Sequence, residues 1–142
     1  MDDSAGTPSF TAEELELIES IFGMARSGST QELAALIDGG VPVNLTNAKG
    51  DSLLILAAYH QHPETVLALL ERGADTDRVN DVGQTAMACA VFRNNAQIAQ
   101  VLLDAGADPD VGNHTALEIA RQFGFSDMVE LLEKHAAGPR GY

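Results

Sequence analysis

Hydrophobic residues recur at the spacing of an α-helix in short segments along the chain. In the first segment, Leu15, Ile18 and Phe22 lie on one face, and glutamates occupy the opposite face. Thr11 is a suitable N-cap and Gly28 a suitable stop, so the pattern predicts a helix between them. The same reasoning predicts seven further helices, which begin near Thr30, Ser52, Pro63, Thr85, Asn95, Thr115 and Ser126.

These segments repeat along the chain. Gly50–Asp75 contains a glycine turn, a short helix, a tight turn, a second helix and a glycine stop, and the same layout returns from Gly83. Gly50 and Gly83 are 33 residues apart, as are Gly73 and Gly106. A fixed period of this size is typical of stacked repeats, whose terminal members are atypical because each has only one neighbour.

The period also predicts the boundaries. In the last repeat, Asn113 replaces the leading glycine, and Thr115 follows Thr85 by 30 residues, so this hairpin is three residues shorter. We expect one domain at 10–136, with repeats at about 10–49, 50–82, 83–112 and 113–136, and loose tails at 1–9 and 137–142.

Composition narrows the class of protein. The net charge of −13 disfavours nucleic acid as a partner and favours a protein partner with a basic surface. The acidic N-terminus is unlike a secretory signal, no apolar run is long enough to span a membrane, and the single Cys89 excludes an internal disulfide. We therefore expect a cytoplasmic monomer. The excess of Arg over Lys, with abundant Ala and Gly, is typical of bacterial coding sequences.

The motifs of the two regular repeats carry a family resemblance. Each has a glycine turn, an Ala-containing first helix, a second helix that ends in Leu-Leu, and a Gly-Ala-Asp stop. The residues concerned are Gly50, Leu54, Leu56, Ala57, Ala58, Leu69, Leu70, Gly73, Ala74 and Asp75, then Gly83, Thr85, Ala90, Leu102, Leu103, Gly106, Ala107 and Asp108. This layout resembles the ankyrin repeat over about residues 20–136. The resemblance implies an all-α solenoid of about four helix-turn-helix repeats joined by short β-hairpin turns.

Two departures from the family pattern are visible. The family's Thr-Pro-Leu-His motif, which begins the first helix of a repeat, lacks Pro and His in all three repeats after the first. The resemblance implies that this His ties a repeat to its hairpin, so its loss implies less rigid repeats. The glycine expected between the two helices of a repeat is replaced by Gln61 and Asn94 and is present as Gly124. Asn tolerates the left-handed conformation expected there better than Gln does.

The resemblance also implies where a partner binds, namely a concave groove lined by hairpin tips and by the ends of the first helices. Tyr59 and Phe92 are one period apart, so they should be neighbours on this face, with Phe123 close by. Tyr, Phe and Arg are frequent interface residues, although these rings could also pack only against adjacent turns. The partner-binding candidates are Arg26, Lys49, Asp51, Tyr59, His60, Asp81, Val82, Gln84, Phe92, Arg93, Gln122 and Phe123, with His114 at a hairpin tip.

Other chemistry is weakly supported. His60 and His62 form an H-x-H pair without an evident third ligand, and His62 matches a turn histidine of the ankyrin pattern. Cys89 occupies a core position, so we interpret it as a small buried residue. The aspartates at 75–77 and 108–110 fit turns better than a calcium loop.

We therefore predict a non-enzymatic protein–protein interaction module without a cofactor, an adaptor or regulator of another protein, for example of a stress-response enzyme such as a catalase. The alternative is a small-ligand or metal-binding protein that uses His60 and His62 together with Cys89.

Overall fold

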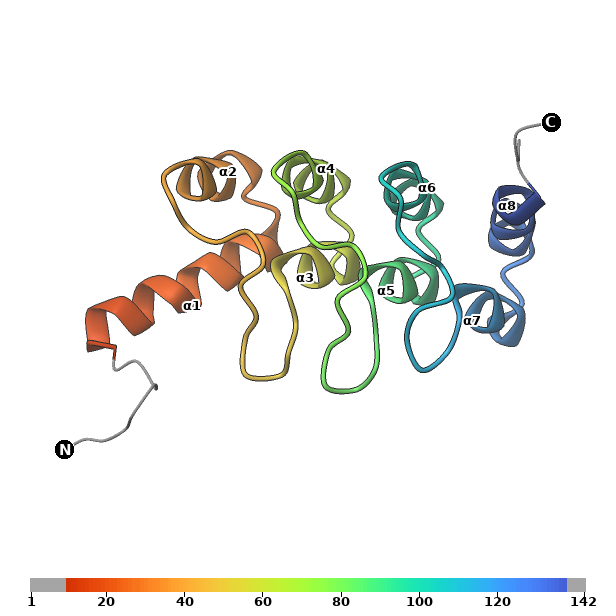
Figure 1. The fold of residues 1–142 in the computed structure, drawn as a ribbon, viewed down its shortest axis with the longest axis horizontal. Coiled ribbons are helices and arrows are strands. Elements are labelled where there is room, and N and C mark those ends of the chain that lie inside the picture. The colour runs from red at the N-terminus through yellow and green to blue at the C-terminus, as the bar shows by residue number, and fades with distance from the viewer. Residues whose placement is uncertain (1–9, 138–142) are drawn as a thin grey trace.

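The computed structural model describes residues 10–137, and helices in this part of the chain form two rows (Figure 1). The inner row consists of α1 (Ala12–Ser27), α3 (Leu53–Tyr59), α5 (Ala86–Phe92) and α7 (Ala116–Phe123). The outer row consists of α2 (Thr30–Asp38), α4 (Pro63–Glu71), α6 (Ala96–Asp104) and α8 (Ser126–Ala137). The expectation of an all-α solenoid of helix pairs is confirmed. The tails predicted at 1–9 and 137–142 lie outside the described residues, except for Ala137, which ends α8.

Side-chain caps begin the inner helices as the sequence predicted. Thr11 and Thr115 complete capping boxes with Glu14 and Glu118, in which each partner accepts from the other's backbone N–H. Each such cap stabilises a helix by about 1 kcal/mol. Ser52 and Thr85 accept one backbone N–H each at the start of α3 and α5, and Asn95 does the same for the outer helix α6. The last helix, α8, begins at Ser126, where the sequence predicted a helix start.

The turns between paired helices share one backbone conformation. Gln61 and Asn94 have φ angles of 66° and 54°, and Gly28 and Gly124 lie in the same left-handed region. The chain thus accepts non-glycine residues at two of these turns, as the sequence indicated, at a cost of about 1–2 kcal/mol for each.

The core lies between the two rows, where α3 packs between α1 and α5. All residues of α3 from Leu53 to Ala58 are buried, because inner helices of this stack have neighbours on both sides as well as an outer helix. Leu15 shares the apolar face of α1 with Phe22 but is 50% exposed, whereas Phe22 is buried. The first half of α1 extends past α3 and has no helix beside it (Figure 1).

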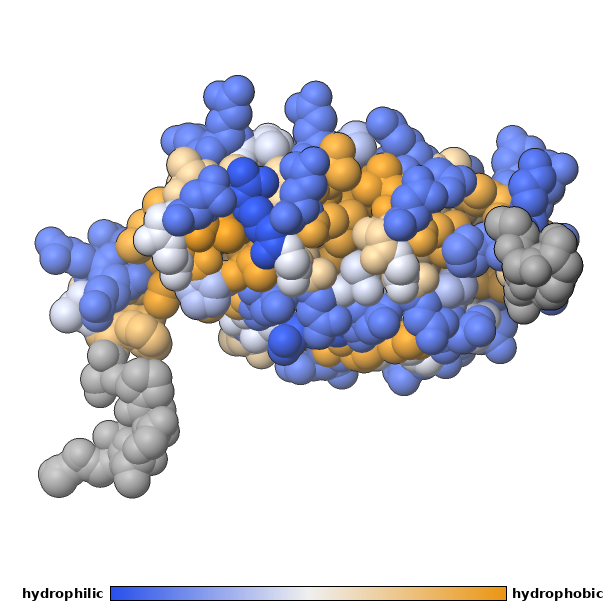
Figure 2. All heavy atoms as spheres, turned by 45° about the horizontal axis from the view of Figure 1, so that its top comes forward, coloured by the Kyte–Doolittle hydropathy of each residue, from blue (hydrophilic) through white to orange (hydrophobic). Residues whose placement is uncertain are grey.

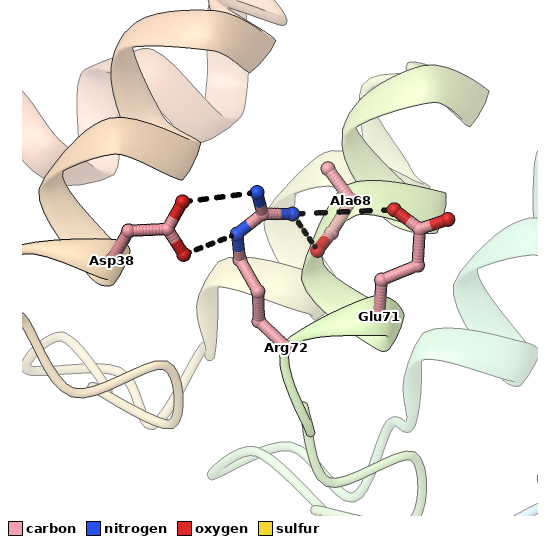
Figure 3. Close-up of polar contacts among 4 residues, drawn as sticks. All are labelled: Asp38, Ala68, Glu71 and Arg72. Atoms are coloured by element: carbon pink, nitrogen blue, oxygen red, sulfur yellow. Dashed lines mark hydrogen bonds and ion pairs between the residues drawn. The ribbon is translucent and has the colours of Figure 1, made fainter.

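Polar contacts join α2 to α4 in the outer row. Arg72 donates from Nε and Nη2 to the two carboxylate oxygens of Asp38, at 2.9 and 3.2 Å, and from Nη1 to the Ala68 carbonyl (Figure 3). This paired hydrogen bonding lowers the pKa of Asp38 and raises that of Arg72. Figure 2 shows the outer side of the molecule, where hydrophilic side chains project and hydrophobic atoms remain visible between them.

Aspartates connect the turns that follow the outer helices. Asn44 accepts from the backbone N–H of Asp75, and Asp77 accepts from that of Asp108, at 2.8 and 3.0 Å. Asp75 and Asp108 in turn accept the N–H two residues later. These oxygens are therefore used in linking successive repeats, which fits the interpretation of the aspartates as turn residues.

Candidate functional site

An open groove of about 780 Å³ lies between the inner helices and the first two hairpins. The residues predicted from the sequence that line it are Arg26, Lys49, Asp51, Tyr59, His60, Asp81, Val82, Gln84 and Phe92. Arg93, Gln122 and Phe123 do not line this volume. His114 is exposed, with Nδ1 4.0 Å from a Glu118 carboxylate oxygen. Further lining residues, which sequence reasoning did not select, include Glu19, Asn47, Ile55 and Asn80.

Two asparagines hold the hairpins that form one wall of the groove. The side-chain oxygen of Asn47 accepts from the backbone N–H groups of Lys49 and Asp51, at 2.9 and 3.0 Å. Asn80 does the same for Val82 and Gln84, at 3.1 and 2.8 Å. The spacing of 33 residues between Asn47 and Asn80 was the available sequence signal for this role.

Successive hairpins are also bonded to each other. The Asp81 N–H donates to the Lys49 carbonyl at 3.0 Å, and the Asn80 side-chain amide donates to Asp51 Oδ1 at 2.7 Å. One oxygen of the Asp51 carboxylate is therefore already engaged. A methyl group added at Gly50 would lie 2.7 Å from Asp81 Oδ1 and 3.0 Å from the Asp81 nitrogen. Glycine is thus required at this turn by the approach of the next hairpin as well as by its φ of 79°.

Aromatic rings form a continuous row across successive repeats. The rings of Tyr59 and Phe92 stack with centroids 6.4 Å apart and 13° between their planes. Phe92 meets Phe123 edge to face at 5.5 Å, and Phe123 stacks on Phe125 at 5.7 Å. Phe92 and Phe123 nevertheless remain 43% and 50% exposed. The rings therefore do pack against one another, and still present a large apolar surface to solvent.

Basic side chains lie where the inner helices end. Arg26 is in the last turn of α1, while His60 and Arg93 cap the C-termini of α3 and α5. The Arg93 guanidinium carbon lies 5.0 Å from the centroid of the Tyr59 ring, within the range of a cation–π interaction. The pKa of His60 is lowered by burial and then by the positive charge of its neighbours, which include His62, Arg26 and Arg93. We call Arg26, His60 and Arg93 the basic rim.

His62 has a structural contact that the metal-binding alternative did not anticipate. Its Nε2 lies 2.7 Å from the Arg26 carbonyl oxygen and so joins the first repeat to the second. Its ring also packs against Gly28, where an added methyl group would lie 2.6 Å from Nδ1. Within residues 10–137, no group of three His, Cys, Asp or Glu side chains is arranged to hold a metal ion.

Cys89 lies under the groove floor. It is 1% exposed, in agreement with its interpretation as a small core residue. Burial, together with the negative charge of Asp51, raises the pKa of the thiol to about 12. The thiolate is the nucleophilic form of cysteine, so this environment keeps Cys89 unreactive at neutral pH.

Paired helices stacked in two rows, with bonded hairpins along one side, define an all-α solenoid repeat protein. The chain belongs to the ankyrin repeat family, because the family model for ankyrin repeats (3 copies) matches residues 21–113 and 73–140. Ankyrin repeats are generally protein–protein interaction modules, and the family is typically non-enzymatic.

One curated relative supports the assignment. A protein of Pseudomonas aeruginosa that is named as an ankyrin repeat protein, PA3287, is 48% identical over 59 residues. The match covers 42% of this chain and 34% of that protein, so the chain spans about a third of the relative's length. None of the helices in residues 10–137 is long and apolar enough to cross a membrane.

Proposed function

We propose that the groove binds a protein partner and that the chain acts as an adaptor or regulator of that partner. The observation that carries this proposal is the aromatic row that begins in the groove with Tyr59 and Phe92 and continues to Phe123, where Phe92 and Phe123 remain about half exposed. Only 5% of the chain is aromatic, so the gathering of these rings on one surface is informative. Aromatic side chains and Arg are the residue types that most often dominate binding energy at protein interfaces.

Preorganisation supports the same proposal. The rings are held by contact with one another, and the hairpins are held by Asn47 and Asn80. A partner would therefore meet a surface whose side chains have already lost much of their conformational freedom. Less entropy is then lost on binding, so more of the contact energy contributes to affinity.

Charge adds a long-range component to the proposal. The net charge of −13 favours encounter with a partner of positive net charge and opposes approach to nucleic acid or to anionic lipid. A cytoplasmic monomer that meets its partner by diffusion is part of the proposal. No residue of the groove points to a catalase or to another particular stress-response enzyme, so the proposal extends to a protein partner and no further.

The test is capture of partners from the native lysate with the wild-type chain and with two variants. Phe92→Ala removes the central ring of the aromatic row and is expected to weaken capture by about 30-fold, the loss typical of a strong interface residue. Leu67→Ala is the matched control, because Leu67 is 48% exposed on α4, in the outer row. Circular dichroism verifies the fold of both variants.

The two variants separate a groove from a general apolar surface. Loss of a captured protein with Phe92→Ala and its retention with Leu67→Ala supports the proposal. Equal capture by wild type and by Phe92→Ala, or equal loss with both variants, contradicts it.

A further inference from the structure

Two cations that line the groove, Arg26 and Lys49, and a third beside it, Arg93, make no ion pair within residues 10–137. In the same part of the chain, Arg72 and Arg121 form salt bridges at 2.9 and 2.8 Å. Arg26, Lys49 and Arg93 form none, although the chain has 21 Asp and Glu against 8 Lys and Arg. Arg78 and Lys134 form none either in this part of the chain, so what distinguishes Arg26 and Arg93 is their position beside Tyr59 and Phe92.

The basic rim lies directly beside the aromatic row. Arg93 follows Phe92 in the chain and its guanidinium lies over the Tyr59 ring, and His60 meets the same ring edge to face at 5.2 Å. Burial and His62 lower the pKa of His60 most, and Arg26 and Arg93 lower it further, so these groups lie within electrostatic reach of one another. An apolar surface next to unpaired positive charge is complementary to a segment in which an apolar side chain adjoins a carboxylate.

We propose that the basic rim and the aromatic row together bind a segment of the protein partner in which Asp or Glu alternates with aromatic or aliphatic residues. This inference rests on the proposed function and specifies the chemistry of the bound segment. The partner as a whole can still be basic, since net charge governs encounter at long range, whereas the groove contacts a short segment. The rings exclude water from the ion pairs, and a carboxylate pairs more strongly with Arg in such surroundings than in open solvent.

The hairpin wall of the groove carries negative charge, which would favour a basic rather than an acidic segment. Asp51 and Asp81 line the hairpin side and would favour a basic segment. One oxygen of Asp51 already accepts from Asn80, and Lys49 lies on the same wall. Asp51 keeps its negative charge in that hydrogen bond, and Glu19 also lines the groove. Arg93 lies directly against the Tyr59 ring, so a segment bound along the rings meets positive charge there, which favours the acidic segment.

The test uses three fluorescein-labelled twelve-residue peptides in which Phe and Leu alternate with Glu, with Gln or with Lys. Fluorescence anisotropy with the full chain gives the dissociation constants at 20 and 200 mM NaCl. We expect the Glu peptide to bind at least about tenfold more tightly than the Gln peptide at low salt, and to lose most of that advantage at high salt. The net charge of the chain works against this result, because it repels the Glu peptide and attracts the Lys peptide.

Variants that remove single charges test which residues cause the preference for the Glu peptide. Arg93→Ala and, independently, Arg26→Ala are each expected to weaken the Glu peptide by about fivefold to tenfold and leave the Gln peptide nearly unchanged. Lys134→Ala, at an exposed position of α8, removes the same charge away from the groove and is expected to change the binding of neither peptide. Native circular dichroism of each variant confirms that the comparison is between folded proteins.

The outcomes separate this inference from the proposed function. Tighter binding of the Lys peptide, equal binding of all three, or an equal effect of Lys134→Ala and Arg93→Ala overturns the carboxylate preference. If Phe92→Ala still weakens binding of the Gln or Lys peptide, the groove recognises protein segments but without a preference for carboxylates. If no peptide binds at millimolar concentration, the inference fails, and capture with Phe92→Ala then decides the proposed function separately.

Discussion

Replacement of Gly50 by Ala tests whether contact between hairpins shapes the groove. Gly50 has a φ of 79°, and the next hairpin approaches it, so an added methyl group would lie 3.0 Å from the Asp81 nitrogen and 3.3 Å from the Asn80 Cα. These are backbone atoms, which cannot rotate away. Gly73 is a matched control, since its φ is 88° and no atom lies within 4 Å of an added methyl group.

The free-energy costs of the left-handed backbone and of the displaced hairpin can be worked out separately. An L-residue in the left-handed region costs about 1–2 kcal/mol, and both variants lose this amount. Gly50→Ala also forces the second hairpin away and so strains the 3.0 Å bond from the Asp81 N–H to the Lys49 carbonyl. A net backbone hydrogen bond contributes about 0.5–1.5 kcal/mol, and displaced packing adds to that. We expect a loss of about 1–2 kcal/mol for Gly73→Ala and about 2–4 kcal/mol for Gly50→Ala.

Urea unfolding followed by circular dichroism at 222 nm measures both free energies of unfolding. The Asp81 amide should also exchange with deuterium faster in Gly50→Ala and at the wild-type rate in Gly73→Ala. Equal destabilisation of the two variants, with an unchanged Asp81 amide, would refute the claim that hairpin contact requires glycine here.

Three further predictions follow from named contacts. His62→Ala removes the 2.7 Å contact of Nε2 with the Arg26 carbonyl and should lower the free energy of unfolding by about 1 kcal/mol in urea titration; an unchanged midpoint contradicts this. The pKa of His60 should lie below its ordinary value of 6.5 in an NMR titration and rise in Arg93→Ala. A lowered pKa means that protonation of His60 disfavours the folded state, so the stability that neutral His60 contributes is lost as the pH falls below 6.5. A measured pKa above 6.5 argues against the basic rim. Cys89, with a thiol pKa of about 12, should react with Ellman's reagent at pH 8 only after unfolding in urea, and rapid native labelling would show that it is accessible.

Repetition made much of the fold predictable. The 33-residue spacing of Gly50 and Gly83 and the capping residues Ser52 and Thr85 are local signals, and the helices begin beside them. The exposure of Leu15 was not predictable, because helical spacing shows which residues share a face but not whether another helix covers that face. Only the end of the stack beside α1 decides that Leu15 stays half exposed.

The candidate site was predictable in part. Tyr59 and Phe92 are one period apart, so their stacking follows from the repeat itself. The cation–π contact of Arg93 with Tyr59 and the edge-to-face contact of Phe92 with Phe123 depend on side-chain directions between neighbouring repeats, which one-dimensional spacing does not specify.

The sequence by itself determined the period, the helices and the family, because caps, glycine stops and apolar spacing act within a few residues of one another. The tertiary structure decided which charges remain unpaired. Arg72 meets Asp38 across two outer helices, whereas Arg26 and Arg93 meet no carboxylate within residues 10–137. Ion pairing depends on distances of a few ångströms between residues far apart in the chain, and only the stacking of one repeat on the next sets those distances.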